Sequence, residues 1–184
     1  MEMPEDPTER LQDDVHEHAE RARKQPWVLR VAVSTAFFAA LAAITSLLAG
    51  HEANDAMMEQ IRASDQWSHY QAKTTRAAVL ESKAALLVAM SRPAESKDSE
   101  KLAEYERDRK ELGEKAEELT RSSESHFRCH MHFARGVTLF QVAIALAAVA
   151  ILAQRKEIWY GSWLLAGIGI VFVVLGLAAI LHAG

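Results

Sequence analysis

The sequence has little cysteine and little proline, and each shortage excludes something. A single cysteine, Cys129, rules out an intrachain disulfide and says little about the redox compartment. There are only four prolines, and none lies between Trp27 and Arg92. No proline therefore breaks a helix over that range. Long stretches of alternating apolar and polar residues are also lacking, so we expect almost no β-strand.

The sequence also has no large excess of positive or negative charge, and it has no recognisable catalytic motif. The chain carries 21 Lys and Arg against 25 Asp and Glu, a net charge of −4 that is too small to imply a nucleic-acid partner. There is no phosphate-binding glycine loop, no CxxC pair and no serine in a nucleophile-elbow glycine pattern. We therefore expect neither an enzyme nor a cofactor.

The large apolar residues gather in three uncharged runs, residues 31–50, 136–153 and 158–181. Each is long enough for a transmembrane helix. A cleaved signal peptide is the competing interpretation of the first run, but its leader and its apolar core would both be unusually long. The sequence predicts an all-α membrane protein with three transmembrane helices and a long, coiled-coil-like antiparallel hairpin between the first and the second. Its predicted segments are a polar tail at 1–27, spans at 28–50, 136–153 and 158–182, a water-exposed hairpin at 51–135 with its tip near 91–99, and a short basic link at 154–157.

One long helix, residues 99–153, organises this prediction. Its packing seam alternates steps of three and four residues without a slip, which is the pattern that keeps one helix face against a partner. The seam begins in a charged segment and ends in an uncharged one, so we expect a single helix that leaves water and enters a bilayer. The seam residues are Leu102, Tyr105, Arg109, Leu112, Ala116, Leu119, Ser123, His126, His130, Phe133, Val137, Phe140 and Ile144.

The other arm of the hairpin, residues 51–90, has a weaker stripe of small and apolar residues. Pro93 and the polar residues after it predict the tip. If the hairpin pivots at the membrane edge, its antiparallel register brings Glu52 and Asp55 near Arg135, His132 and His130. The predicted stripe comprises Met57, Ile61, Ser64, Ser68, Ala72, Thr75, Val79, Leu86 and Ala89.

Small residues line two of the predicted spans, which would let helices approach closely in lipid. In the first span they are Ala36, Ala39, Ala40, Ala43, Ser46 and Gly50; in the third they form a seam repeated every seven residues, Ser162, Gly169, Gly176 and Ala183. Ordinary glycine enrichment in membrane helices is the alternative explanation. The third span starts with Trp159, Tyr160 and Trp163, which is typical of a membrane interface.

Basic residues decide the expected topology. Four flank the first span on its N-terminal side and two lie in the link at Arg155 and Lys156, and three spans place both groups on one side. The positive-inside rule then favours a cytoplasmic N-terminus with the hairpin outside.

Two groups of polar residues near residue 130 are candidate sites. His126, Cys129, His130 and His132 could chelate zinc or copper, because His126 and His130 lie four apart on one helix face. The alternative is a structural polar layer that fixes helix register, with the acidic residues paired to Arg135. Residues that could form this layer, or the edge of a pore, are His51, Glu52, Asp55, His130, Arg135 and Gln141.

Three separated motifs carry a family resemblance: AAITSLLAGHEAN at 42–54, ASDQWSHYQAK at 63–73 and HFARGVTLFQVAIAL at 132–146. Together they resemble the bacterial membrane proteins of domain-of-unknown-function family 4337. The resemblance covers about residues 27–180, with three hydrophobic spans in the same order. It implies a bacterial inner-membrane protein and no particular activity.

Two functions fit these features. The first is a structural or interaction protein whose helical stalk self-associates, with the lipid bilayer and further copies of the chain as partners. The second is an oligomeric ion channel or conductance regulator with polar rings at the membrane edge. Polar residues are nearly absent deeper than Gln141, which favours the first.

Overall fold

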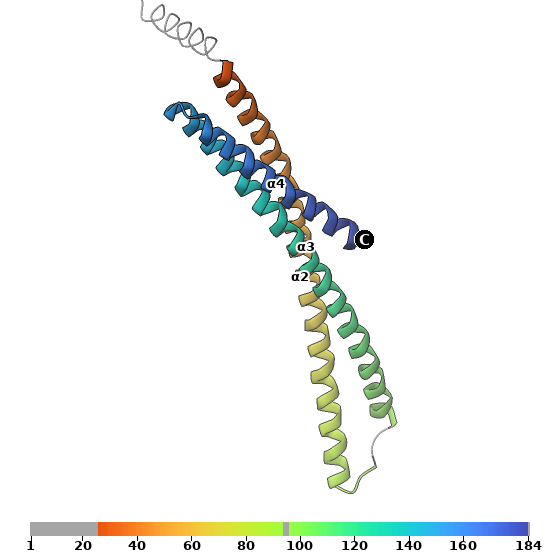
Figure 1. Cartoon of the computed structure of the whole chain (residues 1–184). Helices are drawn as coiled ribbons and strands as arrows, with labels where there is room; N and C mark the ends of the chain where they lie inside the picture. The colour runs from red at the N-terminus through yellow and green to blue at the C-terminus, as the bar shows by residue number, and fades with distance from the viewer. Residues whose placement is uncertain (1–25, 94–95, 184) are drawn as a thin grey trace, which may run out of the picture. The chain divides into compact units, whose positions relative to one another are not determined.

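The computed structural model describes residues 26–93 and 96–183, with side chains up to residue 181. Within these residues the chain forms three helices and no strand (Figure 1). They are α2 (Pro26–Ala89), α3 (Ser96–Ala153) and α4 (Lys156–Ala183). The predicted tail at 1–27 lies outside the described residues, apart from its last two.

The ends of the helices follow from local chemistry. α2 begins at Pro26, which suits a first helical position because proline has no N–H to leave unpaired. It ends in a Schellman motif, in which Arg92 N–H donates to Leu87 O at 2.9 Å and Ser91 takes a left-handed φ of 57°. Pro93 follows and cannot continue the helix. The same motif ends α3, where Gln154 has φ 53° and Arg155 N–H donates to Ala150 O at 3.1 Å.

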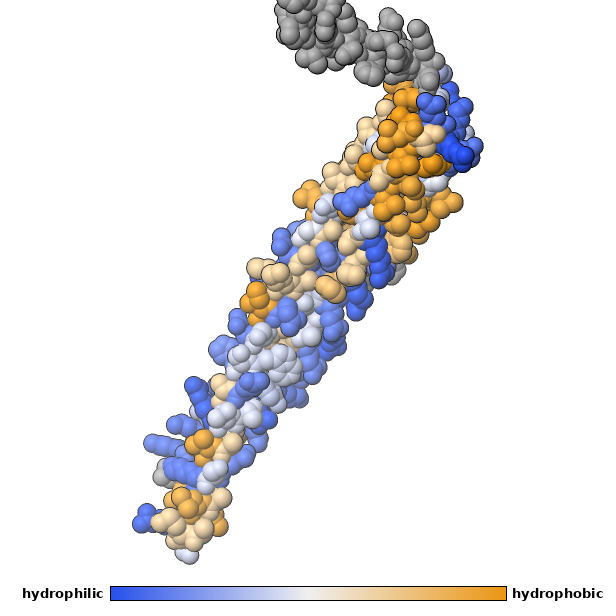
Figure 2. All heavy atoms as spheres, turned by 90° about the vertical axis from the view of Figure 1, so that its left-hand side faces the viewer, coloured by the Kyte–Doolittle hydropathy of each residue, from blue (hydrophilic) through white to orange (hydrophobic). Residues whose placement is uncertain are grey.

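Each of the three helices contains a stretch that is long enough and apolar enough to cross a membrane. α2 and α3 each join an apolar half to a polar half without a break, and α3 passes through Arg135 as one helix. Figure 2 shows apolar side chains gathered over one stretch of the surface and mainly hydrophilic ones over another. The predicted change from uncharged to charged sequence within one continuous helix is therefore present in the fold.

The chain divides into two compact units. The described part of the first unit comprises residues 26–49 and 132–178. Its core cluster draws on all three helices and consists of Phe38, Ala42, Phe140, Ala143 and Ala166, with Leu41, Ile144, Leu165 and Val173 packed against it.

Glycines on α4 make room for aromatic rings from α3. A Cβ at Gly176 would lie 2.7 Å from Phe133 Cε1, and one at Gly169 would lie 2.9 Å from Phe140 Cε1. Phe140 follows Phe133 by seven residues on α3, and its partner Gly169 precedes Gly176 by seven residues on α4. This is the pattern of an antiparallel heptad contact. Ser162, one step further on, is fully buried. The small residues predicted to form a seam on α4 therefore lie at its closest helix contact; the Ala183 side chain is outside the described part.

The described part of the second unit comprises residues 50–93, 96–131 and 179–183, and most of it is an antiparallel pair made from the polar halves of α2 and α3. Every residue of the predicted α3 seam in this unit, from Leu102 to His130, is buried or half-buried. Ser123 Oγ donates to Ala56 O at 2.7 Å, Lys73 pairs with Asp108, and Lys83 Nζ lies 2.7 Å from Asp98 Oδ2. These contacts fix one register along the pair.

The small and apolar residues singled out on α2 do not lie on the face that contacts α3. The stripe predicted at 51–90 is exposed along its whole length, and the buried face instead carries Glu52, Ala56, Ala63 and Ala77. The small residues of the first span, from Ala36 to Gly50, are exposed as well. The register also differs from the predicted one by about one heptad, because the offset between α2 and α3 is set by pairs such as Lys73–Asp108 and not by a pivot at the membrane edge.

Candidate functional site

A buried glutamate–histidine pair marks the candidate site in the second unit. Glu52 lies on the buried face of α2 with only 8% of its side chain exposed, and its Oε2 is 2.8 Å from Nδ1 of His126 on α3. This distance is within hydrogen-bonding range, and an imidazole N–H can donate to a carboxylate oxygen. A buried carboxylate needs such a partner, because transfer from water is costly without one.

Next to this pair lies a buried thiol. Cys129 is 2% exposed, and its pKa is raised above the usual 9.0, first by burial and then by the negative charge of Glu52, while Arg128 acts in the opposite direction. A raised pKa keeps the thiol protonated at neutral pH, and a protonated thiol is a poor nucleophile and a poor metal ligand. Cys129 therefore serves as a small core residue of the α2–α3 contact.

A cavity of ≈ 580 Å³ opens beside the pair and the thiol. Most of the residues around it have polar side chains, and Ile180 of α4 is an apolar one. The lining residues are Glu52, Glu118, Arg121, Ser122, Ser125, His126, Cys129 and Ile180. Sequence reasoning missed Glu118, Ser122 and Ser125, because they lie beside the seam and only the register shows that they border Glu52.

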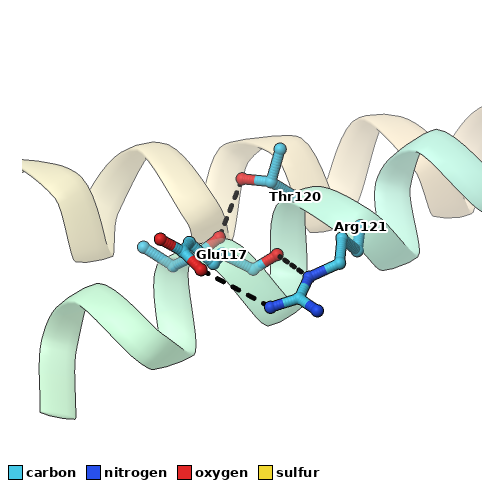
Figure 3. A network of polar contacts seen from close by, with 4 residues as sticks. Glu117, Thr120 and Arg121 are labelled. Carbon is cyan, nitrogen blue, oxygen red and sulfur yellow. Dashed lines mark hydrogen bonds and ion pairs between the residues drawn. The ribbon is translucent and has the colours of Figure 1, made fainter.

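One wall of this cavity carries a surface ion pair within α3. Arg121 Nη2 lies 3.5 Å from Glu117 Oε2, and its Nε donates to Glu117 O, while Thr120 Oγ1 donates to Ala116 O at 2.7 Å (Figure 3). Both charged side chains are more than 60% exposed. Exposed pairs four residues apart add only about 0.3–0.5 kcal/mol to helix stability.

The structure does not bring the four metal candidates into one site. Among the described residues no group of three or more His, Cys, Asp or Glu side chains is placed to hold a metal ion. His126 faces Glu52, whereas His130 stacks beside Phe127 with ring centroids 6.0 Å apart. His132 lies beside Phe172, and its Nδ1 is buried without a hydrogen-bond partner among the described residues.

The six residues proposed for a polar layer also have separate environments. His51 and Asp55 form an exposed contact at 3.4 Å within α2, and Gln141 is exposed on α3. The Arg135 guanidinium stacks over the Phe172 ring at 5.9 Å, so the expected pairing of acids with Arg135 is replaced by this contact and by Glu52–His126. A polar layer does exist in the second unit, but it is built from Glu52, Ser123 and His126.

A second polar contact occupies the middle of the pair. Arg109, on the α3 seam, donates from Nη2 to Tyr70 Oη at 3.4 Å and lies 5.3 Å from the centre of the Tyr70 ring. This hydrogen bond is the main reason that the pKa of Arg109 is raised. The Tyr70 ring lies 3.6 Å from where a Gly113 Cβ would be, so the glycine lets the ring fit closely. Arg109 thus has an aromatic partner across the hairpin in place of an acid.

Taken together, these contacts specify register. When apolar residues repeat every seven positions, shifting one helix by seven residues changes the apolar packing little. A polar pair that can form at only one offset between the helices disfavours such a shift. Three polar contacts fit only the observed offset: Ser123–Ala56 is buried, and Glu52–His126 and Arg109–Tyr70 are partly buried.

One of three comparisons with known proteins found a match. Neither the curated proteins nor the solved structures include a match to this chain. The model of one protein family, described as a domain of unknown function, matches residues 27–179, a range that takes in nearly all of the three helices. The chain therefore belongs to the family of domain of unknown function DUF4337.

Proposed function

We propose that this chain is a structural, self-associating membrane protein, in which three spans anchor a stalk made of the polar halves of α2 and α3. The stalk is a binding surface for further copies of the chain. No catalytic step is part of this proposal.

The observation that carries the proposal is the exposed stripe on the polar half of α2, which we call the outer stripe: Met57, Ile61, Ser64, Ser68, Ala72, Thr75, Val79 and Leu86. Its large members are 55–63% exposed. The α3 seam is not available for self-association, because α2 and α4 of the same chain already cover it. Large apolar residues at both ends of the stripe, with small residues between them, leave room for a second helix to approach on this solvent-facing side.

A second copy is the partner that fits this stripe best. Copies anchored in one bilayer with the same topology present α2 in the same direction, so each outer stripe meets its own counterpart at the same height. Such a contact is self-complementary, as symmetric oligomers require. From Met57 to Leu86 the stripe extends over roughly 45 Å of helix at 1.5 Å per residue.

The anchoring half of the proposal rests on the three apolar helices. Arg30 directly precedes the uncharged run at 31–50, and Arg155 and Lys156 precede the third span, so all three lie at the ends that the positive-inside rule assigns to the cytoplasm. We place the protein in a bacterial cytoplasmic membrane with its N-terminus inside and the stalk outside.

No specific observation favours the channel alternative. A pore edge would need Glu52 to face an axial opening, and its carboxylate instead contacts His126 within the chain.

Light scattering on the full chain in mild detergent tests self-association. We expect an oligomer, and we expect Ile61→Lys to shift it toward the monomer, because each lysine would face its counterpart across the contact. Ala103→Lys is the matched control, since it puts the same charge on an exposed position of α3. A monomeric parent chain, or equal behaviour of the two variants, would contradict the proposal.

A further inference from the structure

The first unit has a groove that the proposed stalk does not use. It is an apolar hollow of ≈ 650 Å³ between the beginning of α2 and the beginning of α4. The lining residues are Leu29, Arg30, Val33, Ser34, Phe37, Trp159 and Trp163. Leu29, Val33 and Phe37 are each more than half exposed, so the groove is open on its outer side.

The walls of this groove are held in place from behind. Trp159 Nε1 donates to Ser34 Oγ at 3.1 Å, and Ser34, itself 4% exposed, donates to Val31 O at 2.8 Å. Trp163 packs its ring against the buried Phe38 ring in an edge-to-face contact, with centroids 5.1 Å apart. Both indoles are therefore fixed before any ligand arrives, and a pre-formed apolar site loses less entropy on binding.

The charge at this end of the spans is positive. Among residues 26–34 and 155–163, three side chains are basic, Arg30, Arg155 and Lys156, and one is acidic, Glu157. Arg30 lines the groove at the first residue before the apolar run of α2, and no described acidic side chain pairs with it. Tryptophans lie at headgroup level in membranes, so Arg30 is at the height of lipid phosphates.

We propose that this groove binds one anionic phospholipid, with the phosphate at Arg30 and an acyl chain along Val33, Phe37 and Trp163. The guanidinium matches the geometry of a phosphate and presents several N–H donors to it. Basic pockets between membrane helices are suited to anionic headgroups, and the apolar floor suits a hydrocarbon chain and no polar ligand. The inference rests on the membrane insertion proposed above.

Native mass spectrometry of the full chain in mild detergent tests the site. The probe is an equimolar mixture of phosphatidylglycerol and phosphatidylcholine with identical acyl chains. We expect about one lipid retained per chain, with a preference of about fivefold for phosphatidylglycerol, the effect of one basic side chain near a lipid surface. Arg30→Gln removes the preference, Arg30→Lys keeps most of it, and Arg62→Gln, which removes the same charge from the polar half of α2, leaves it unchanged.

A second pair of variants tests the groove itself. Val33→Trp fills the hollow from its exposed side and lowers retention of both lipids, whereas Val142→Trp adds the same bulk at an exposed position outside it. A preference that survives Arg30→Gln, full retention by Val33→Trp, or a bound polypeptide in place of a lipid would each overturn the inference. Glycerol phosphate without acyl chains should not compete, and competition would point to a free-phosphate site. Failure of membrane insertion shows separately, as release of the chain from membranes by alkaline carbonate.

Discussion

At the scale of single residues, the Glu52–His126 pair is the contact on which the register depends most. Removing one partner leaves the other buried and unpaired, which costs about 1–3 kcal/mol. We therefore expect His126→Leu to destabilise the chain by that amount, and the double variant Glu52→Leu with His126→Leu to recover most of the loss, because two apolar side chains can pack where the pair was.

Thermal unfolding of the variants in detergent, followed by circular dichroism, measures this coupling. His51→Leu is the control, since the His51–Asp55 contact is exposed and worth little. Losses that simply add in the double variant would show that the pair does not act as a unit.

Cys129 gives the prediction that depends on pH. Its pKa is raised in the folded chain above the usual 9.0, so below pH 9 the thiol is protonated in both the folded and the unfolded state and adds no pH dependence. Above pH 9 the unfolded state releases the proton first, and the stability of the folded state falls as pH rises. We expect this alkaline loss to be smaller in Cys129→Ala, as read from unfolding temperatures of both proteins between pH 7 and pH 10. Parallel curves for the two proteins over that range would refute the assignment.

At the scale of elements, the contact of α3 with α4 depends on the absence of side chains at two glycines. Gly176→Ala places a Cβ 2.7 Å from the ring of Phe133, which is fully buried and cannot move aside. We expect a loss of about 1–3 kcal/mol, the usual cost of overpacking. The control is Gly167→Ala, which meets no atom within 4 Å and should be neutral or slightly stabilising because alanine favours helix. Equal unfolding temperatures for the two variants would argue against this packing.

Sequence patterns predicted helix faces better than they predicted helix partners. The α3 seam could be predicted because its 3–4 spacing runs unbroken from Leu102 to Ile144, and all of its residues are buried or half-buried. The face of α2 that contacts α3 could not be predicted, because Tyr70 and Lys73 look solvent-facing in the sequence and are half-buried only through their contacts with Arg109 and Asp108 on α3.

The register was missed for a related reason. A heptad repeat looks the same after a shift of seven residues, so the seam alone cannot tell one offset from the next. Only the polar contacts between α2 and α3 distinguish one offset from another, and the sequence does not show which residues form these contacts. Glu52 was accordingly expected beside Arg135 and lies beside His126. His126 and His130, whose spacing suggested a metal site, lie in two different environments, the first beside Glu52 and the second beside Phe127.

At the scale of the whole molecule, the account rests on two helices that each join an apolar span to a polar stalk. Labelling of single cysteines by a membrane-impermeant maleimide, in a Cys129→Ala background, tests this directly in both right-side-out and inside-out vesicles. Leu47 and Ala78 are both exposed positions of α2, the first in its apolar half and the second in its polar half. The account predicts that Ala78→Cys is labelled in one vesicle orientation and Leu47→Cys in neither until detergent is added; labelling of Leu47→Cys as readily as Ala78→Cys in intact vesicles would contradict it.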